Sequence, residues 1–119
     1  MEDSHWHVVQ GLQHKNNGNH KAAIAEFNKA IELDSTNENA YVFRGGSYGS
    51  LGEWGLAIAD YTYAIDLNKK GDNYTSRGLA YFMAGEHEKA GSDLEEALRL
   101  NPEDPEAKAV MAELEKIGY

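Results

Sequence analysis

The sequence contains no cysteine, few basic residues and no long hydrophobic run. Without cysteine, a disulfide framework and a thiolate metal site are both impossible, which is compatible with a reducing compartment. The start, MEDSHWHVV, is acidic and polar rather than basic and then apolar, so a secretory signal is not expected. No stretch approaches the roughly 20 apolar residues of a membrane span. We therefore expect a cytoplasmic protein of 119 residues, which suits one domain.

The shortage of basic residues limits the classes of partner. Lysine and arginine number 11 against 20 aspartates and glutamates, which gives a formal net charge of −9. Such a chain repels phosphate backbones and anionic lipid heads, so nucleic acid and membrane surfaces are not expected partners. Much of the excess negative charge lies toward the C-terminus, because residues 86–119 hold ten acidic and four basic side chains.

The motifs of catalysis are also missing. There is no nucleophile elbow or cysteine nucleophile, and the carboxylates are scattered as on solvated helix faces. The glycine-rich stretch GGSYGSLGEWG lacks the lysine and hydroxyl residue that end a phosphate loop. We predict a protein that is not an enzyme and that needs no cofactor or metal.

One spaced pattern occurs three times in the chain. Glycine, glycine, alanine, an aromatic or leucine, alanine and leucine recur with a period of 34 and then 33 residues. The three sets are Gly11, Gly18, Ala23, Phe27, Ala30 and Leu33; Gly45, Gly52, Ala57, Tyr61, Ala64 and Leu67; and Gly78, Gly85, Ala90, Leu94, Ala97 and Leu100. A period of this length marks a helical repeat array. The missing residue falls in the connection after Leu67.

Apolar residues spaced by 3 and 4 predict two helices in each repeat. Glycines 18, 52 and 85 separate the members of each pair, where positive φ is needed. Small residues such as Gly45 and Ala57 lie where two antiparallel helices must approach closely. The expected helices cover about 5–16, 20–33, 39–51, 54–67, 73–84 and 87–100, followed by a capping helix from Pro105.

This pattern resembles the tetratricopeptide repeat family. The second repeat matches it fully, with Tyr41, Gly45, Tyr48, Gly52, Trp54, Ala57, Tyr61 and Ala64. The other two depart from it, with histidines at 7, 14 and 20 in the first repeat and with His87 and Leu94 in the third. The resemblance implies an all-α fold, a right-handed superhelical array of antiparallel helix pairs. The single domain, 1–119, would hold repeats at about 4–37, 38–70 and 71–104 and a capping helix at 105–119.

The resemblance also implies a concave groove lined by the first helix of each pair, and hence a non-catalytic protein-interaction module. By fit to the family pattern, the lining would be largely apolar and almost uncharged. The residues expected to bind a partner there are Val8, Val9, Leu12, Val42, Phe43, Gly46, Gly49, Leu79, Phe82 and Met83. Such a groove suits a peptide or helical segment of a partner protein. A self-associating scaffold, which seats a second copy in the groove or on an end helix, is the alternative.

Members of the family that bind acidic heat-shock chaperone tails share a clamp of lysine, asparagine and arginine. The matching places here hold Val8, Leu12, Phe43, Asp72 and Ser76. Because no cation stands there and the domain is acidic, we do not expect such a tail to bind.

Two groove glycines leave two explanations open. Gly46 and Gly49 each cost a helix about 1 kcal/mol relative to alanine. Either their missing side chains let the backbone of a partner come close, or the residue type at these groove positions is free to vary because packing does not constrain it.

Other polar residues are expected to be structural. The histidines at 7, 14, 20 and 87 replace large packing residues of the family pattern, which favours a packing role over a metal site. Arg44 and Arg77 share one register, and Glu26, Asp60 and Asp93 share another, so we predict ion pairs between the two sets. Met1 fits a complete protein and an excised domain alike.

Overall fold

The computed structural model describes residues 1–119 as seven helices without strands. The helices are α1 (Ser4–Asn16), α2 (His20–Leu33), α3 (Glu38–Ser50), α4 (Trp54–Leu67), α5 (Gly71–Met83), α6 (His87–Leu100) and α7 (Pro105–Lys116). The predicted all-α array is confirmed, and each helix begins within two residues of its expected start. The shorter second period is also explained, because residues 68–70 join α4 to α5 where residues 34–37 join α2 to α3.

Local signals in the sequence set the helix ends. The carboxylate of Asp3 accepts a hydrogen bond from the amide of Trp6 at 2.8 Å, and Asp104 caps α7 in the same way. The turns inside the three pairs pass through glycines 18, 52 and 85 at φ between 76° and 82°. This left-handed region strains other residues, which explains why glycine recurs there.

Each helix pair closes over a second, buried glycine. A Cβ on Gly45 would stand 3.0 Å from the ring of Tyr61, and one on Gly78 would stand 3.0 Å from the side chain of Leu94. The ring of buried Phe27 fills the same space at Gly11. The absence of a side chain at these three positions therefore lets the two helices of each pair approach.

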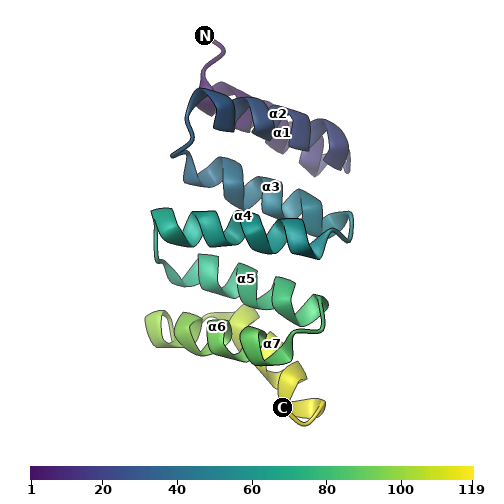
Figure 1. The fold of residues 1–119 in the computed structure, drawn as a ribbon, viewed down its shortest axis with the longest axis vertical. Coiled ribbons are helices and arrows are strands. Elements are labelled where there is room, and N and C mark those ends of the chain that lie inside the picture. The colour runs from purple at the N-terminus through teal and green to yellow at the C-terminus, as the bar shows by residue number, and fades with distance from the viewer.

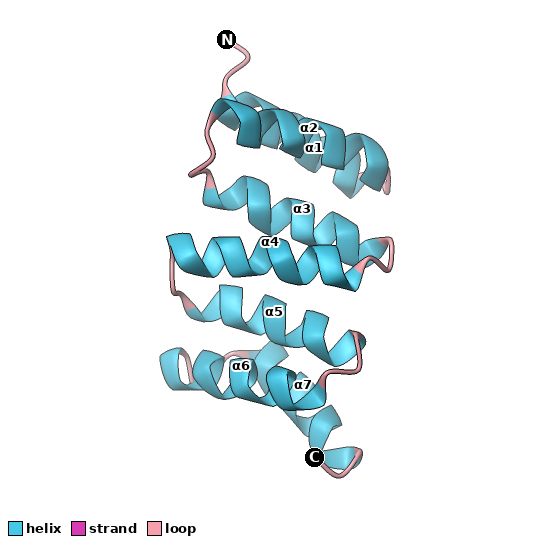
Figure 2. Cartoon of the chain, viewed as in Figure 1, coloured by secondary structure: helices cyan, strands magenta, loops and turns pink.

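The helices stack into two layers along an elongated body of 49 × 25 × 21 Å (Figures 1 and 2). Each helix packs against the next in sequence, while α2, α4 and α6 lie nearer the viewer in Figure 1. On the other layer α1 also contacts α3, and α5 contacts α7, whereas the even-numbered helices make no comparable contact with one another. The odd-numbered helices thus form the inner face of the superhelix.

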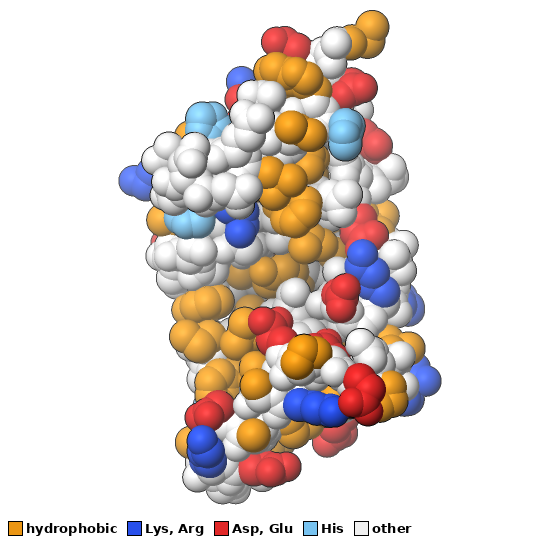
Figure 3. Space-filling view, turned by 180° about the vertical axis from the view of Figure 1, so that it is seen from behind, with side chains coloured by type: hydrophobic (Ala, Val, Ile, Leu, Met, Phe, Trp, Pro, Cys, Tyr) orange, Lys and Arg blue, Asp and Glu red, His pale blue; other side chains and the backbone are white.

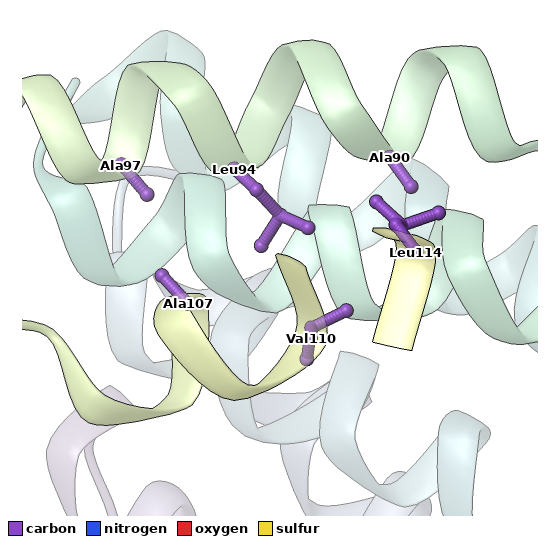
Figure 4. Packing of buried hydrophobic residues seen from close by; sticks show 6 residues of the cluster. All are labelled: Ala90, Leu94, Ala97, Ala107, Val110 and Leu114. Carbon is purple, nitrogen blue, oxygen red and sulfur yellow. The ribbon is translucent and has the colours of Figure 1, made fainter. Parts of the chain in front are cut away.

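Two hydrophobic clusters hold the ends of the array. At the N-terminal end Val8, Ala23, Phe27, Ala30 and Ala40 are buried together. At the other end three residues of α6 point at three residues of α7 (Figure 4): Ala90, Leu94, Ala97, Ala107, Val110 and Leu114. Because alanines allow α7 to lie close to α6, the last helix covers the apolar side that an open array would leave exposed.

Buried charge pairs lie within each repeat, and two arginines of these pairs also bond to the preceding repeat. Arg44 donates two hydrogen bonds to the buried carboxylate of Asp60, at 2.9 and 2.7 Å, and a third to Asn28 of the preceding repeat. Arg77 repeats the arrangement with Asp93 and Thr62. The predicted arginine pairs are confirmed. In the first repeat the carboxylate of Glu26 contacts buried His7 instead, at 2.7 Å.

Removing Arg44 should destabilise the fold strongly at neutral pH. Burial raises the pKa of Asp60 and the hydrogen bonds from Arg44 oppose that rise, so Arg44→Ala leaves a buried carboxylate without its cation. We expect a loss of about 3 kcal/mol in the free energy of unfolding, measured by urea denaturation at pH 7. The loss should shrink toward pH 4, because a protonated Asp60 needs no partner.

Arg99→Ala is the matched control, since Arg99 pairs with Glu96 on the exposed surface. A loss for Arg44→Ala no larger than for Arg99→Ala would contradict the structural role of the buried pair.

Candidate protein-binding groove

The inner face is the candidate site, and we call it the groove: the surface formed by α1, α3 and α5. Figure 3, which turns the molecule by 180°, shows hydrophobic side chains in a band down the upper half of this face, with charged side chains gathered over the lower half. The apolar lining follows from the repeat register, because the first helix of each pair turns the same row of side chains toward this face.

Two of the expected contact residues are well exposed. Val9 on α1 keeps 37% of its surface accessible, and Met83 at the end of α5 keeps 51%. Val8 is different, because only 4% of it is exposed and it packs in the N-terminal cluster with Phe27. The expectation that Val8 contacts a partner is therefore corrected, since this valine belongs to the core.

The larger apolar residues of the groove are half-buried. Leu12 and Phe43 pack against the N-terminal cluster, and Phe43 lies 6.2 Å from Phe27 between ring centroids. Leu79 and Phe82 on α5 pack against the C-terminal cluster, and Val42 on α3 is half-buried. These side chains serve the core with one side and face outward with the other, so the groove is rigidly supported.

The two groove glycines have intramolecular neighbours. A Cβ on Gly49 would stand 2.8 Å from the ring of Trp54, the residue that begins α4. A Cβ on Gly46 would stand 3.1 Å from the Cε atom of Lys15, which reaches across from α1. The tryptophan ring requires glycine at 49, whereas the end of a lysine side chain can move away from position 46.

Alanine substitutions should separate these two glycines. Gly46→Ala should raise the free energy of unfolding by about 1 kcal/mol, because alanine is the better helix former and Lys15 can shift. Gly49→Ala should bring no such gain, since the new methyl group meets the Trp54 ring. Thermal and urea denaturation measure both. In a Trp54→Leu background Gly49→Ala should recover the gain, and its failure to do so would refute the packing explanation.

Two polar residues of the groove floor were missed by sequence reasoning. The ammonium nitrogen of Lys15 and the hydroxyl of Tyr61 lie 3.6 and 3.8 Å from the point where a Cβ of residue 46 would stand. Burial, followed by the charges of Asp60 and Glu106, raises the pKa of Tyr61 to about 12, so its hydroxyl stays protonated at neutral pH. The repeat register could have revealed Lys15, because it lies 34 residues before Gly49.

The positions of the carboxylate clamp offer no cation. Val8 is buried, while Leu12 and Phe43 are half-buried apolar residues. Asp72 is exposed in the first turn of α5, and Ser76 follows it one turn later. Lys15, which has a different register position, lies instead beside Gly46 on α3.

The rest of the surface offers shallow cavities as further candidate binding sites. The shallow cavities of the molecule lie around residues 86–89, 3–5 with 33–37, 18–22 with Leu51, and 59–66, and no expected groove residue lines any of them. No group of three or more histidine and carboxylate side chains is placed to hold a metal ion. None of the seven helices combines the length and the apolar character that crossing a membrane requires.

Comparison with known proteins identifies the repeat. Residues 9–37 and 72–104 each match a sequence profile described as the tetratricopeptide repeat. The chain belongs to the tetratricopeptide repeat family. The middle repeat, between the two matched segments, has the same helix pair and the same packing of a glycine against a large side chain of the facing helix. Tetratricopeptide repeat domains generally mediate protein–protein interactions.

Relatives and solved structures agree with this membership. The chain is 31% identical over 94 residues to DnaJ homolog subfamily C member 3 of Gallus gallus, and this match covers 79% of the chain and 19% of that protein. It is 32% identical over 108 residues to tetratricopeptide repeat protein 36 of Danio rerio, covering 87% of the chain and 58% of that protein. The chain thus spans less than two thirds of either relative.

Among solved structures, the first tetratricopeptide repeat domain of Spaghetti (RPAP3), bound to the HSP90 peptide SRMEEVD, superposes with a TM-score of 0.93 at 25% identity. The match covers 97% of this chain and 92% of that one. The backbone of a peptide-binding domain is therefore reproduced almost entirely, while three quarters of the aligned side chains differ.

Proposed function

We propose that this tetratricopeptide repeat domain binds a predominantly apolar peptide or helical segment of a partner protein in its groove. The observation that carries the proposal is the character of the inner face: exposed Val9 and Met83 flank half-buried Leu12, Phe43 and Phe82. An apolar surface of this kind gains free energy when a partner removes it from water. Helix-in-groove binding would supply anchors at helical spacing for such a row of side chains.

The same surface argues against an acidic tail as the ligand. The Spaghetti domain binds SRMEEVD, yet the corresponding clamp positions of this chain hold apolar residues, a serine and Asp72. Carboxylates in a ligand would meet no paired donor at these positions and would approach a domain of net charge −9.

The peptide SRMEEVD is therefore a negative probe. Calorimetric titration of the domain with this peptide should give no saturable binding at peptide concentrations up to about 1 mM, which corresponds to about 4 kcal/mol of binding free energy. Binding in the micromolar range would contradict our interpretation of the missing clamp.

A random peptide library selected on the wild-type domain supplies a positive probe. The selected peptides should be rich in aliphatic and aromatic residues, and each should lose about tenfold or more in affinity on Val9→Glu plus Met83→Glu. These two positions are exposed, so the variant keeps its helical signal, whereas Phe43→Glu or Phe82→Glu would also disturb a core cluster. Fluorescence anisotropy measures the affinities.

Leu56→Glu is the control, because Leu56 is a comparably exposed apolar residue on α4, in the outer layer. Equal losses for the groove variant and for Leu56→Glu would contradict the proposal. A dilution series followed by light scattering tests the scaffold alternative, since a second copy in the groove would make the mass depend on concentration.

A further inference from the structure

The charges of the inner helices are mostly neutralised within the molecule. On α3, Glu38 pairs with Lys70 at 3.1 Å, and Arg44 pairs with Asp60. On α5, Arg77 pairs with Asp93. The charges that remain without an ion-pair partner on this face are therefore few, and each one is available to a bound segment.

Lys15 is the free cation of the groove. It makes no ion pair, it is half-buried, and its side chain lies over Gly46 in the middle of α3. No acidic residue lies on α1, so nothing on its own helix neutralises it. The hydroxyl of Tyr61, a hydrogen-bond donor at neutral pH, lies beside the same gap.

Two carboxylates without an ion-pair partner, Asp72 and Glu106, lie away from Lys15, on α5 and on α7. The hydroxyl of buried Thr75 donates a 2.6 Å hydrogen bond to the carboxylate of Asp104, which fastens α5 to the residue that caps the N-terminus of α7. Asp72 lies one turn before Thr75, and Glu106 lies two residues after Asp104. Both are exposed and neither forms an ion pair.

The field of Glu106 extends into the groove. Although it belongs to α7, its charge contributes to raising the pKa of Tyr61, whose hydroxyl is at the groove floor beside Gly46. The groove therefore has a cation, Lys15, over α1 and α3 and an anion, Asp72, on α5, together with its apolar side chains, while a second anion, Glu106, lies on the adjoining helix α7. Complementary charge fixes the register and direction in which a segment binds, more than it raises affinity.

We infer that the groove binds its partner in one direction: the partner is an apolar segment with an acidic group at the end over Lys15 and basic residues at the end over Asp72 and Glu106. The inference rests on the proposed function and adds the charge order of the partner. A polyacidic tail would be repelled at one end of the groove, and a wholly basic segment would be repelled at the other.

Charge exchange between domain and peptide tests the inference. The domain variant Lys15→Glu, Asp72→Lys, Glu106→Lys reverses the charge at both ends, on side chains that are exposed or only half-buried. The probes are a peptide selected from the library on the wild-type domain and its counterpart, in which every acidic residue is exchanged for lysine and every basic one for glutamate. Wild type should prefer the selected peptide by at least tenfold, and the variant should prefer the counterpart. Both preferences should weaken in 1 M salt, where screening is strong.

The control variant is Lys21→Glu, Asp66→Lys, Glu95→Lys, which makes the same change in net charge at exposed positions on α2, α4 and α6. It should keep the wild-type preference. Selected peptides without charge order, or a triple groove variant that keeps the wild-type preference, would overturn the inference while leaving the groove intact. Selected peptides that are insensitive to Val9→Glu plus Met83→Glu would instead overturn the proposed function, and this inference with it.

Discussion

The structure depends on three positions where a side chain is absent. Gly11, Gly45 and Gly78 each receive the side chain of the facing helix, from Phe27, Tyr61 and Leu94. A methyl group at any of them would push the two helices apart, since side chains in a packed core have little room to relax. Because the same contact recurs in each pair, the three pairs share one geometry and stack with one handedness.

The stack in turn creates the groove. Among its inner helices α1 contacts α3, and α2 and α4 join successive pairs by packing against α3 and α5. Arg44, held by Asp60 within its own repeat, also donates a hydrogen bond to Asn28 of the preceding repeat. Residues such as Phe43 and Phe82 belong to the core and the groove at once. A partner would thus meet a preorganised surface, which reduces the conformational entropy lost on binding.

The sequence predicts the fold well because its signals are local and repeated. Glycine turns, alanine spacing and caps such as Asp104 act within a few residues, and three copies confirm one another. The groove was predicted less well, because exposure depends on neighbours distant in sequence. Val8 fits the lining pattern yet is buried beneath α2, and Gly49 needs Trp54 rather than a partner. Lys15 shares the register of Gly49, which marks it as a groove position, but its approach to Gly46 depends on the packing of α1 against α3.

The central claim is that the inner face is the binding surface, and amide chemical-shift mapping tests it most directly. A peptide selected on the domain is titrated into the isotope-labelled protein. Our account predicts that the largest shifts fall on α1, α3 and α5, with Val9, Gly46 and Met83 among them. Shifts concentrated on the exposed face of α4, around Leu56 and Tyr63, would contradict it and place the binding surface on the outer layer.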